Sequence, residues 1–362
     1  MLRPRREIEN LSSGVHGGLD YKELEGWGIS PQNIMDFSVS TNPYGPPGGI
    51  RRAIKQSVIS DYPDSAATEL KKTLAKKTRV PPENLLVGNG STELIRLITT
   101  AYLTDEHSVI LPQPTYGEYE LASRIAGAKA IKQTLSPESA FKMDTGETVS
   151  LINKHRPKAV FICNPNNPTG QYLSKAEITN IVRASRDTLI VLDEAYIAFT
   201  ENPWSSTDLI KAGNVIILRS MTKDYALAGL RLGYMIAPES IISVLDKVKP
   251  PWNVSSIAQG AGIFVLEKAG YLEECRRKIN ISKEYLFTEF RGLGLNPLPS
   301  RTNFFMIRVG NARRFREKLL RKEILVRDCT SFGFPDYIRL APRSMADCRR
   351  LIKAIKEIGG LS

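Results

Sequence analysis

Thr188-Leu-Ile-Val-Leu-Asp193 and Val215-Ile-Ile-Leu-Arg-Ser-Met-Thr-Lys223 are the two stretches of sequence that decide the fold. Each contains a short, β-branched apolar run of the kind that forms a strand buried on both faces of a parallel sheet. Each then ends in polar residues, which the carboxyl edge of an open α/β sheet presents to a ligand. Similar runs alternate with helical patterns at 84–87, 108–111, 159–162, 188–192, 214–218 and 233–236. The alternation predicts an α/β fold with a mostly parallel central sheet.

The chain of 362 residues is long for a single core, so we expect one large domain and one smaller domain. Residues 1–45 are expected to form an irregular N-terminal arm and residues 46–248 the large domain. The break at Pro250-Pro251 marks a small α+β C-terminal domain, residues 249–362. In it we expect a long helical stretch over 255–292, a helix over 311–321, a terminal helix, and strands at 303–307, 324–326 and 337–339.

Composition excludes several classes of protein. With 42% hydrophobic and 24% charged residues the chain is an ordinary globular protein, and no apolar stretch approaches the ~20 residues of a membrane helix. We therefore expect a cytoplasmic protein with no membrane partner. The net charge of +12 is compatible with nucleic-acid binding, but basic runs such as Arg313-Arg-Phe-Arg316 are typical of solvated helix faces. Neither a metal site nor a disulfide is indicated by the scattered cysteines Cys163, Cys275, Cys329 and Cys348.

Asp193 and Lys223 follow two strands that are expected to end at the same edge of the sheet. A lysine ε-amine can form a Schiff base with pyridoxal 5'-phosphate, and a buried carboxylate can keep the pyridine nitrogen of that cofactor protonated. We therefore predict that Lys223 and Asp193 are the catalytic pair of a pyridoxal-phosphate site.

The cofactor phosphate has a candidate site at the turn Gly88-Asn-Gly-Ser-Thr92, which leads from a strand into a helix. The N–H groups of Gly90, Ser91 and Thr92 can face an anion there, although the same residues are equally typical of ordinary helix capping. The turn is no dinucleotide fingerprint, because Glu93 replaces its third glycine. Near Lys223 lie Ser220, Thr222 and Arg231. Their two hydroxyls and guanidinium can add to the phosphate site. Alternatively, the hydroxyls serve only turns and the guanidinium only a surface ion pair.

Three motifs in order extend this pattern: Asn164-Pro-Asn-Asn-Pro-Thr-Gly170, Asp193-Glu-Ala-Tyr196 and the segment from Ser220 to Tyr234. With them the chain closely resembles the fold-type I pyridoxal-phosphate aminotransferases, from about Asp36 to the C-terminal helix. The resemblance implies a large domain with a mostly parallel sheet, a small C-terminal domain and pyridoxal 5'-phosphate as cofactor.

The resemblance also implies roles for individual residues. Asn167 and Tyr196 should hydrogen-bond the phenolic oxygen of the cofactor, and Tyr116 should stack on its ring, although a lone tyrosine there is more often part of a core. Tyr62 matches a tyrosine that reaches the cofactor of the other subunit, which implies a homodimer. Arg339 matches the arginine that grips the acidic end of the substrate.

Two groups within the family compete, and both act on small phosphorylated amines or amino acids. Tyr62-Pro-Asp64 and Asn89-Gly-Ser-Thr-Glu-Leu94 resemble the histidinol-phosphate aminotransferases of histidine synthesis. His16-Gly-Gly18, Thr41-Asn42-Pro43 and Leu325-Val-Arg-Asp-Cys-Thr-Ser-Phe332 resemble the L-threonine-O-3-phosphate decarboxylases of cobalamin synthesis. The sequence favours the decarboxylase; the aminotransferase, or one that acts on another amino acid, is the alternative. The substrate-binding candidates are His16, Asn42, Arg327 and Arg339.

His16 can equally be an exposed loop residue without a role. The reaction depends on which Cα substituent is lost, with Lys223 as general base if it is the proton. A DNA-binding regulator of this fold is disfavoured, because the roughly 35 residues before the matching region are too few for a helix-turn-helix domain. We therefore expect no nucleic-acid partner.

Overall fold

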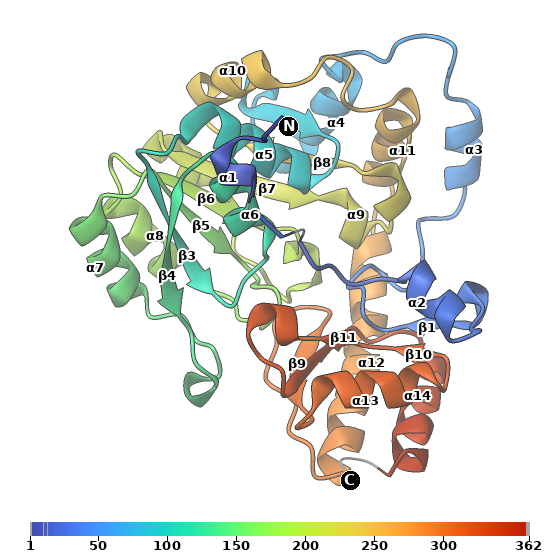
Figure 1. The fold of residues 1–362 in the computed structure, drawn as a ribbon. Coiled ribbons are helices and arrows are strands. Elements are labelled where there is room, and N and C mark those ends of the chain that lie inside the picture. The colour runs from blue at the N-terminus through green and yellow to red at the C-terminus, as the bar shows by residue number, and fades with distance from the viewer. Residues whose placement is uncertain (1, 10, 13, 360–362) are drawn as a thin grey trace.

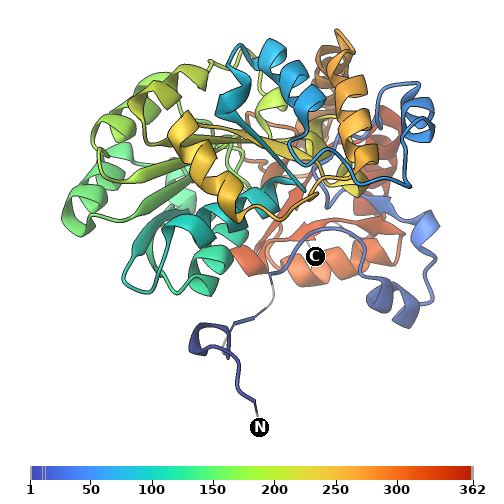
Figure 2. The ribbon, with the colours of Figure 1, turned by 90° about the horizontal axis from the view of Figure 1, so that it is seen from above.

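The computed structural model describes residues 2–9, 11–12 and 14–359. It shows a large domain, built on one wide sheet with helices on both faces, and a smaller domain that contains the C-terminal helices (Figure 1). Seen from above, the sheet is a layer between two layers of helices (Figure 2). This arrangement confirms the α/β fold with a smaller α+β unit that the sequence predicts.

The large sheet has seven strands in the order β2-β8-β7-β6-β5-β3-β4. Only β8 runs antiparallel to its neighbours, so the carboxyl ends of the other six strands lie along one edge. The strands are β2 (Leu85–Gly88), β3 (Ser108–Gln113), β4 (Lys129–Thr134), β5 (Ala159–Cys163), β6 (Leu189–Asp193), β7 (Val215–Ser220) and β8 (Gly233–Ile236).

The core lies on both faces of this sheet, because neighbouring residues of each strand point to opposite sides. Ile190 packs with the helices of one face, and Val191 packs with those of the other. Every residue of β5 and β6 is buried, and each large aliphatic side chain contributes about 1.5–3 kcal/mol by leaving water. One face carries α5 (Ser91–Tyr102), α6 (Glu118–Ile125) and α10 (Glu239–Val248); the other carries α4 (Thr68–Thr78), α7 (Thr145–His155), α8 (Lys175–Arg183) and α11 (Ser256–Leu266).

The smaller domain is an antiparallel sheet, in the order β11-β12-β9, covered by helices. The N-terminal segment joins it, because β1 (Met35–Asp36) pairs in parallel with β10 (Ile324–Leu325). The remaining elements of this region are α2 (Tyr21–Gly26), α12 (Tyr271–Gly292), β9 (Phe305–Arg308), α13 (Ala312–Leu320), β11 (Arg327–Asp328), β12 (Tyr337–Leu340) and α14 (Met345–Glu357). Short helices α1 (Arg6–Glu9), α3 (Ile50–Lys55) and α9 (Met221–Asp224) complete the chain.

Three details differ from the sequence prediction. The helical stretch expected over 255–292 is two helices: α11 ends with Glu267 as its C-cap residue, and α12 begins after Gly270, its N-cap residue, whose φ of +73° breaks the helical path. The N-terminal arm is not wholly irregular, since it contains α1, α2 and β1. Strand β4 was not predicted, because its polar, partly exposed residues suit the edge of a sheet.

The proposed division at residues 45 and 248 stays a prediction. Helix α11, on the C-terminal side of the second boundary, packs against α3 and α4 of the large domain. Among the helices that the structure describes, none is both long and apolar enough to span a bilayer.

Candidate active site

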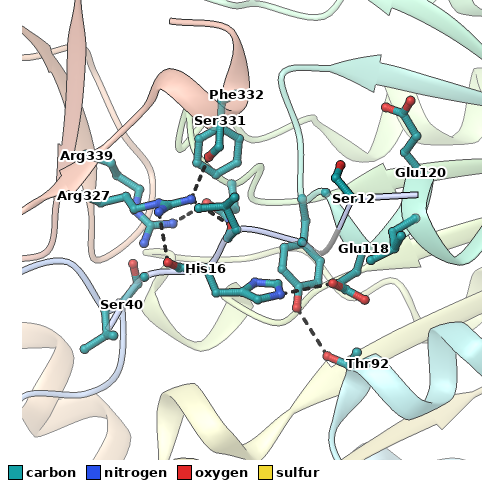
Figure 3. Close-up of a pocket in the computed structure, with 18 of the residues that line it drawn as sticks. Ser12, His16, Ser40, Thr92, Glu118, Glu120, Arg327, Ser331, Phe332 and Arg339 are labelled. Atoms are coloured by element: carbon teal, nitrogen blue, oxygen red, sulfur yellow. Dashed lines mark hydrogen bonds and ion pairs between the residues drawn. The ribbon is translucent and has the colours of Figure 1, made fainter. Parts of the chain in front are cut away.

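A cavity of about 670 Å³ opens at the carboxyl edge of the large sheet, where the N-terminal segment and the smaller domain meet it (Figure 3). Strands β5, β6 and β7 are neighbours, so the residues that follow them are brought together there. Nine residues predicted from the sequence line this cavity: His16, Thr92, Tyr116, Asn167, Tyr196, Lys223, Arg231, Arg327 and Arg339.

Lys223 lies in the single turn of α9 that follows β7. Its carbonyl oxygen accepts a hydrogen bond of 2.8 Å from the backbone N–H of Asn42, which fixes the turn. Burial, followed by the nearby charges of Arg339 and Arg231, lowers the pKa of Lys223 to about 8, against the attraction of Asp193. A lysine with this pKa is partly neutral near pH 7 and can act as a nucleophile or a base.

Asp193, at the end of β6, lies beneath the cavity and is 2% exposed. Its Oδ1 accepts a hydrogen bond from the backbone N–H of Ala195 at 2.9 Å, and its Oδ2 accepts one from the hydroxyl of Tyr119 at 2.7 Å. Burial raises the pKa of Asp193, whereas these two donors and Lys223 favour the ionised form. The carboxylate is therefore held in one orientation close to the amine.

The residues predicted to bind phosphate lie where β2 and β7 end on either side of the first residue of β8. Gly233 pairs with Gly88 on one side and with Ser220 on the other, and a Cβ added to it would lie 2.8 Å from the backbone nitrogen of Ser91. The start of α5, whose first N–H groups have no partner within the helix, therefore packs directly against the start of β8, beside the end of β7.

The groups around this junction suit a phosphate dianion. The hydroxyls of Ser220 and Thr222 lie 2.7 Å apart. Gly90 has a φ of +79°, and a Cβ there would approach Nη2 of Arg231 to 2.9 Å. Two hydroxyls, a guanidinium and the positive end of a helix thus surround a space that only glycine leaves open.

Aromatic and amide side chains form the walls of the cavity. Tyr116 contacts Thr92 through its hydroxyl at 3.3 Å and packs edge-on to Tyr119, with ring centroids 5.5 Å apart. Tyr196 packs edge-on against Phe304 at 4.8 Å, and burial raises its pKa well above the usual value, so its hydroxyl stays protonated.

Two buried arginines of the smaller domain differ in their partners. Arg339 donates to the amide oxygen of Asn167 and, from Nη2, to the carbonyl of Ser38 at 2.7 Å. Its buried Nε has no partner among the described residues. Arg327 donates to backbone carbonyls of the N-terminal segment and to Ser331. Burial, together with the neighbouring Arg339, lowers the pKa of Arg327 to about 10, which leaves it charged at neutral pH.

His16 lines the cavity and its side chain is 52% exposed. Its Nε2 lies 3.1 Å from Oε1 of Glu118, the first residue of α6. This contact with His16, followed by that with Arg96, lowers the pKa of Glu118. The substrate role predicted for His16 stays a prediction.

The other predicted residues lie outside the cavity lining. Gly90 and Ser91 precede and begin the helix whose Thr92 lines the cavity, and Ser220 and Thr222 are close in sequence to Lys223, which lines it too. Asn42 uses its amide to bind the carbonyl of Asp224 at 2.9 Å and the backbone N–H of Tyr44 at 3.1 Å, so its predicted contact with substrate stays a prediction.

Tyr62 is 79% exposed and stacks on Trp252 with ring centroids 4.3 Å apart. In a single chain it does not reach the cavity.

The sequence prediction missed Tyr119 and Glu118. Both belong to the motif Pro114-Thr-Tyr-Gly-Glu-Tyr119, from which only Tyr116 was selected. The sequence contained part of the signal for Tyr119: it follows Tyr116 by three residues where a helix begins, and residues three apart on a helix lie on the same side. The described residues contain no cluster of three His, Cys, Asp or Glu side chains able to hold a metal ion.

Known proteins match nearly the whole chain. Residues 32–355 match the family model described as aminotransferase class I and II. The histidinol-phosphate aminotransferase of Moorella thermoacetica is 33% identical over 338 residues, 91% of this chain and 86% of that protein. The structure of a Sinorhizobium meliloti histidinol-phosphate aminotransferase in complex with pyridoxal-5'-phosphate has a TM-score of 0.89 at 24% identity, over 99% of this chain and 98% of that chain. L-threonine-O-3-phosphate decarboxylase from Porphyromonas gingivalis has a TM-score of 0.80 at 26% identity, over 90% and 99%.

Proposed function

Since the chain belongs to the class I and II aminotransferase family, we propose that it transfers the amino group of histidinol phosphate to an oxo acid. The near-full-length likeness to the Moorella enzyme supports this substrate. The decarboxylase that the sequence favours becomes the second candidate, because a structural neighbour at 26% identity supports it less strongly.

The cofactor of this enzyme is pyridoxal 5'-phosphate, whose ring, when bound, withdraws electrons from the substrate Cα and carries the amino group between the two substrates. The residues present fit it. Gly90, Arg231 and the hydroxyls of Ser220 and Thr222 match a phosphate, and the buried Asp193 matches a protonated ring nitrogen.

The observation that carries the proposal is a lysine that lines the cavity at the sheet edge, with a buried carboxylate and this cradle beside it. We assign Lys223 to hold the cofactor and, once its amine is free, to take the Cα proton. We assign Asp193 to stabilise the positive charge of the protonated ring nitrogen of the cofactor. Arg339, whose buried Nε finds no partner in the described part of the chain, would bind the anionic end of the substrate.

The decarboxylase remains the second candidate because of the position of His16. His16 lines the same cavity as Arg339, so a histidine and a guanidinium could both face a phosphorylated amino acid. In that reaction the same site would release the substrate carboxylate rather than the Cα proton.

The two candidates are separated by one pair of assays on cofactor-loaded protein. Histidinol phosphate with 2-oxoglutarate should yield glutamate, and L-threonine O-3-phosphate should release no carbon dioxide. Carbon dioxide release without glutamate formation would instead establish the decarboxylase. If neither product forms, aminotransferase substrates of other chemistry should be tested next.

We also propose a homodimer that completes the site. Large apolar side chains stand exposed in two nearby segments: Val58, Ile59, Tyr62 and Trp252. Such a patch is unusual on a monomer and suits a second copy of the chain. Mixing Tyr62→Phe subunits with Lys223→Ala subunits tests whether Tyr62 serves the partner's cavity: hybrids should recover activity, whereas additive loss would argue against a shared site. The cytoplasmic location stays a prediction.

A further inference from the structure

Glu93 places a carboxylate in the first turn of α5, the helix whose start forms part of the proposed phosphate cradle. The helix dipole stabilises a negative charge at this end, but a phosphate dianion bound nearby repels it. Glu93 is also the residue that replaces the third glycine of a dinucleotide fingerprint. A carboxylate at this position cannot bind the anion itself, and its contacts show what it does instead.

The carboxylate of Glu93 folds back onto the turn that precedes its own helix. Its Oε2 accepts a hydrogen bond of 2.6 Å from the backbone N–H of Asn89. The same oxygen accepts a second bond, also of 2.6 Å, from Nδ2 of Asn253. In a capping box the glutamate at the third helical position reaches back to the N-cap residue. Here it reaches one residue further, since the N–H of Gly90, the N-cap residue, donates to the carbonyl of Gly88 at 2.8 Å.

The turn from Gly88 to Ser91 needs such a brace, because two of its four residues are glycines. Glycine has the widest choice of backbone conformations and loses the most freedom when one of them is fixed. A Cβ at Gly88 would lie 3.1 Å from Oε2 of Glu93 and 2.6 Å from Cδ2 of Leu94, so a side chain there would crowd the carboxylate. The same glycines that leave room for an anion and for Glu93 therefore depend on Glu93 to hold the turn.

Asn253 connects the turn to the loop that follows α10. Its Nδ2 also lies 3.4 Å from the carbonyl oxygen of Val87 in β2. Its neighbour Trp252 has a φ of +53° and stacks on Tyr62. The brace thus joins the cradle to the exposed aromatic pair that we propose for the contact with a second copy of the chain.

We propose that Glu93 is a positioning residue, held by Asn253, that fixes the turn 88–91 and so keeps the N–H groups at the start of α5 in place for the cofactor phosphate. The inference rests on the cofactor and the cradle of the proposed function, and it is independent of which amino substrate reacts. Because Glu93 does not line the cavity, its effect should appear in the affinity for the cofactor phosphate and not in the chemistry.

The test compares two ligands of the cofactor-free protein, pyridoxal 5'-phosphate and pyridoxal, which lacks the phosphate. Each forms a Schiff base with a lysine, so visible absorbance reports the binding of both. Glu93→Ala should weaken binding of pyridoxal 5'-phosphate about tenfold and change that of pyridoxal by less than about twofold. Equal weakening of both ligands would overturn the proposal, because a general loss of structure would then explain it.

A glutamine variant separates the position of Glu93 from its charge. Both donors use the same oxygen of Glu93, so the single amide oxygen of Glu93→Gln can keep both bonds. This variant should therefore bind pyridoxal 5'-phosphate within about threefold of the parent protein. If the carboxylate acted only by repelling the phosphate, both variants would bind it more tightly, and that result would refute the brace.

Glu177→Ala is the matched control. Glu177 is the third residue of α8 and completes a capping box with Ser174, and neither residue lines the cavity. Its replacement should destabilise α8 yet leave the ratio of the two ligand affinities unchanged. A ratio that falls as far as in Glu93→Ala would show that the loss of any such cap has this effect, and would overturn the proposal.

Asn253→Ala tests the second half of the brace. It should weaken binding of pyridoxal 5'-phosphate less than Glu93→Ala does, and the double variant should bind no worse than Glu93→Ala alone, since both residues act through one carboxylate. Losses that multiply in the double variant would overturn the link between the two residues. Binding of the cofactor without turnover of histidinol phosphate would contradict the proposed function, while the affinity ratios would still decide the role of Glu93.

Discussion

Replacing Tyr119 with Phe removes one hydroxyl and nothing else of consequence. The ring of Tyr119 is fully buried and stacks on Phe161, with ring centroids 5.3 Å apart. Its hydroxyl donates one hydrogen bond of 2.7 Å to Oδ2 of Asp193. Phe keeps the stacking, so the change isolates that bond. A hydrogen bond to a charged group is worth about 1.5–3 kcal/mol, and one pKa unit equals about 1.36 kcal/mol. The bond to the ionised form is stronger than the bond to the neutral form, so the substitution should raise the pKa of Asp193 further.

The sign follows from the protonation states. Burial already raises the pKa of Asp193 in the folded protein above its unfolded value of about 3.9. A carboxyl with a raised pKa lowers folding stability above the unfolded pKa, and this cost disappears as the pH falls below it. Without the Tyr119 hydroxyl the cost is larger. At low pH only a neutral hydrogen bond, worth about 0.5–1.5 kcal/mol, is lost.

The assay is urea unfolding of the cofactor-free protein at pH 7 and at pH 4. Tyr119→Phe should lower the free energy of unfolding by about 1.5–3 kcal/mol at pH 7 and by less at pH 4. Tyr102→Phe, on the half-buried tyrosine of α5, is the control and should change it by less than about 0.5 kcal/mol at both values. A loss that is equal at the two pH values would refute the assigned coupling between Tyr119 and the charge of Asp193.

Four further predictions concern the cofactor and the substrate. Asp193→Asn should retain cofactor, seen by its visible absorbance, yet lower kcat by about 100-fold or more, since a neutral amide cannot stabilise a protonated ring nitrogen; undiminished kcat would contradict its role. Gly90→Val places a β-branched side chain at a φ of +79°, which costs about 1–2 kcal/mol of backbone strain. This variant should bind the cofactor at least about tenfold more weakly in equilibrium dialysis. Unchanged affinity would refute the phosphate cradle. Arg339→Lys should raise KM for the anionic substrate about tenfold or more, because the bidentate grip is lost, and an unaltered KM would exclude that grip. Capture of cofactor by Lys223 in the cofactor-free protein should quicken roughly tenfold between pH 7 and pH 9, because the neutral amine increases as the pH rises through a pKa of about 8; a flat stopped-flow profile would disprove it.

Local sequence was enough to predict the sheet edge and which residues meet there, while phosphate binding by those residues stays a prediction. Asp193 and Lys223 each follow an apolar run, and the parallel pairing of β6 with β7 then places them together. The positions of Gly90 and Ser220 were predictable because a turn and the end of a strand are each recognised from residues that are adjacent in the sequence. The strand β4 was not, because an edge strand exposed to water has a polar sequence like that of a loop.

Contacts between distant segments could not be predicted. Arg327 and His16 are 311 residues apart, and they meet because the N-terminal arm joins the smaller domain through contacts such as the pairing of β1 with β10 and the ion pair between Glu23 and Arg316. The hydrogen bonds from Arg327 to the backbone carbonyls of Val15 and His16 could therefore not be foreseen, and its predicted contact with the substrate stays a prediction. The hydrogen bond from Tyr119 to Asp193 depends likewise on α6 lying over the end of β6.

The account depends most on Lys223 as the attachment point of the cofactor. Borohydride reduction of protein loaded with pyridoxal 5'-phosphate, followed by proteolysis and mass spectrometry, locates that attachment. The account predicts one phosphopyridoxyl group per chain, on Lys223, and none on that position in Lys223→Ala. A label on another lysine, or one spread over surface lysines with Lys223 unmodified, would contradict it.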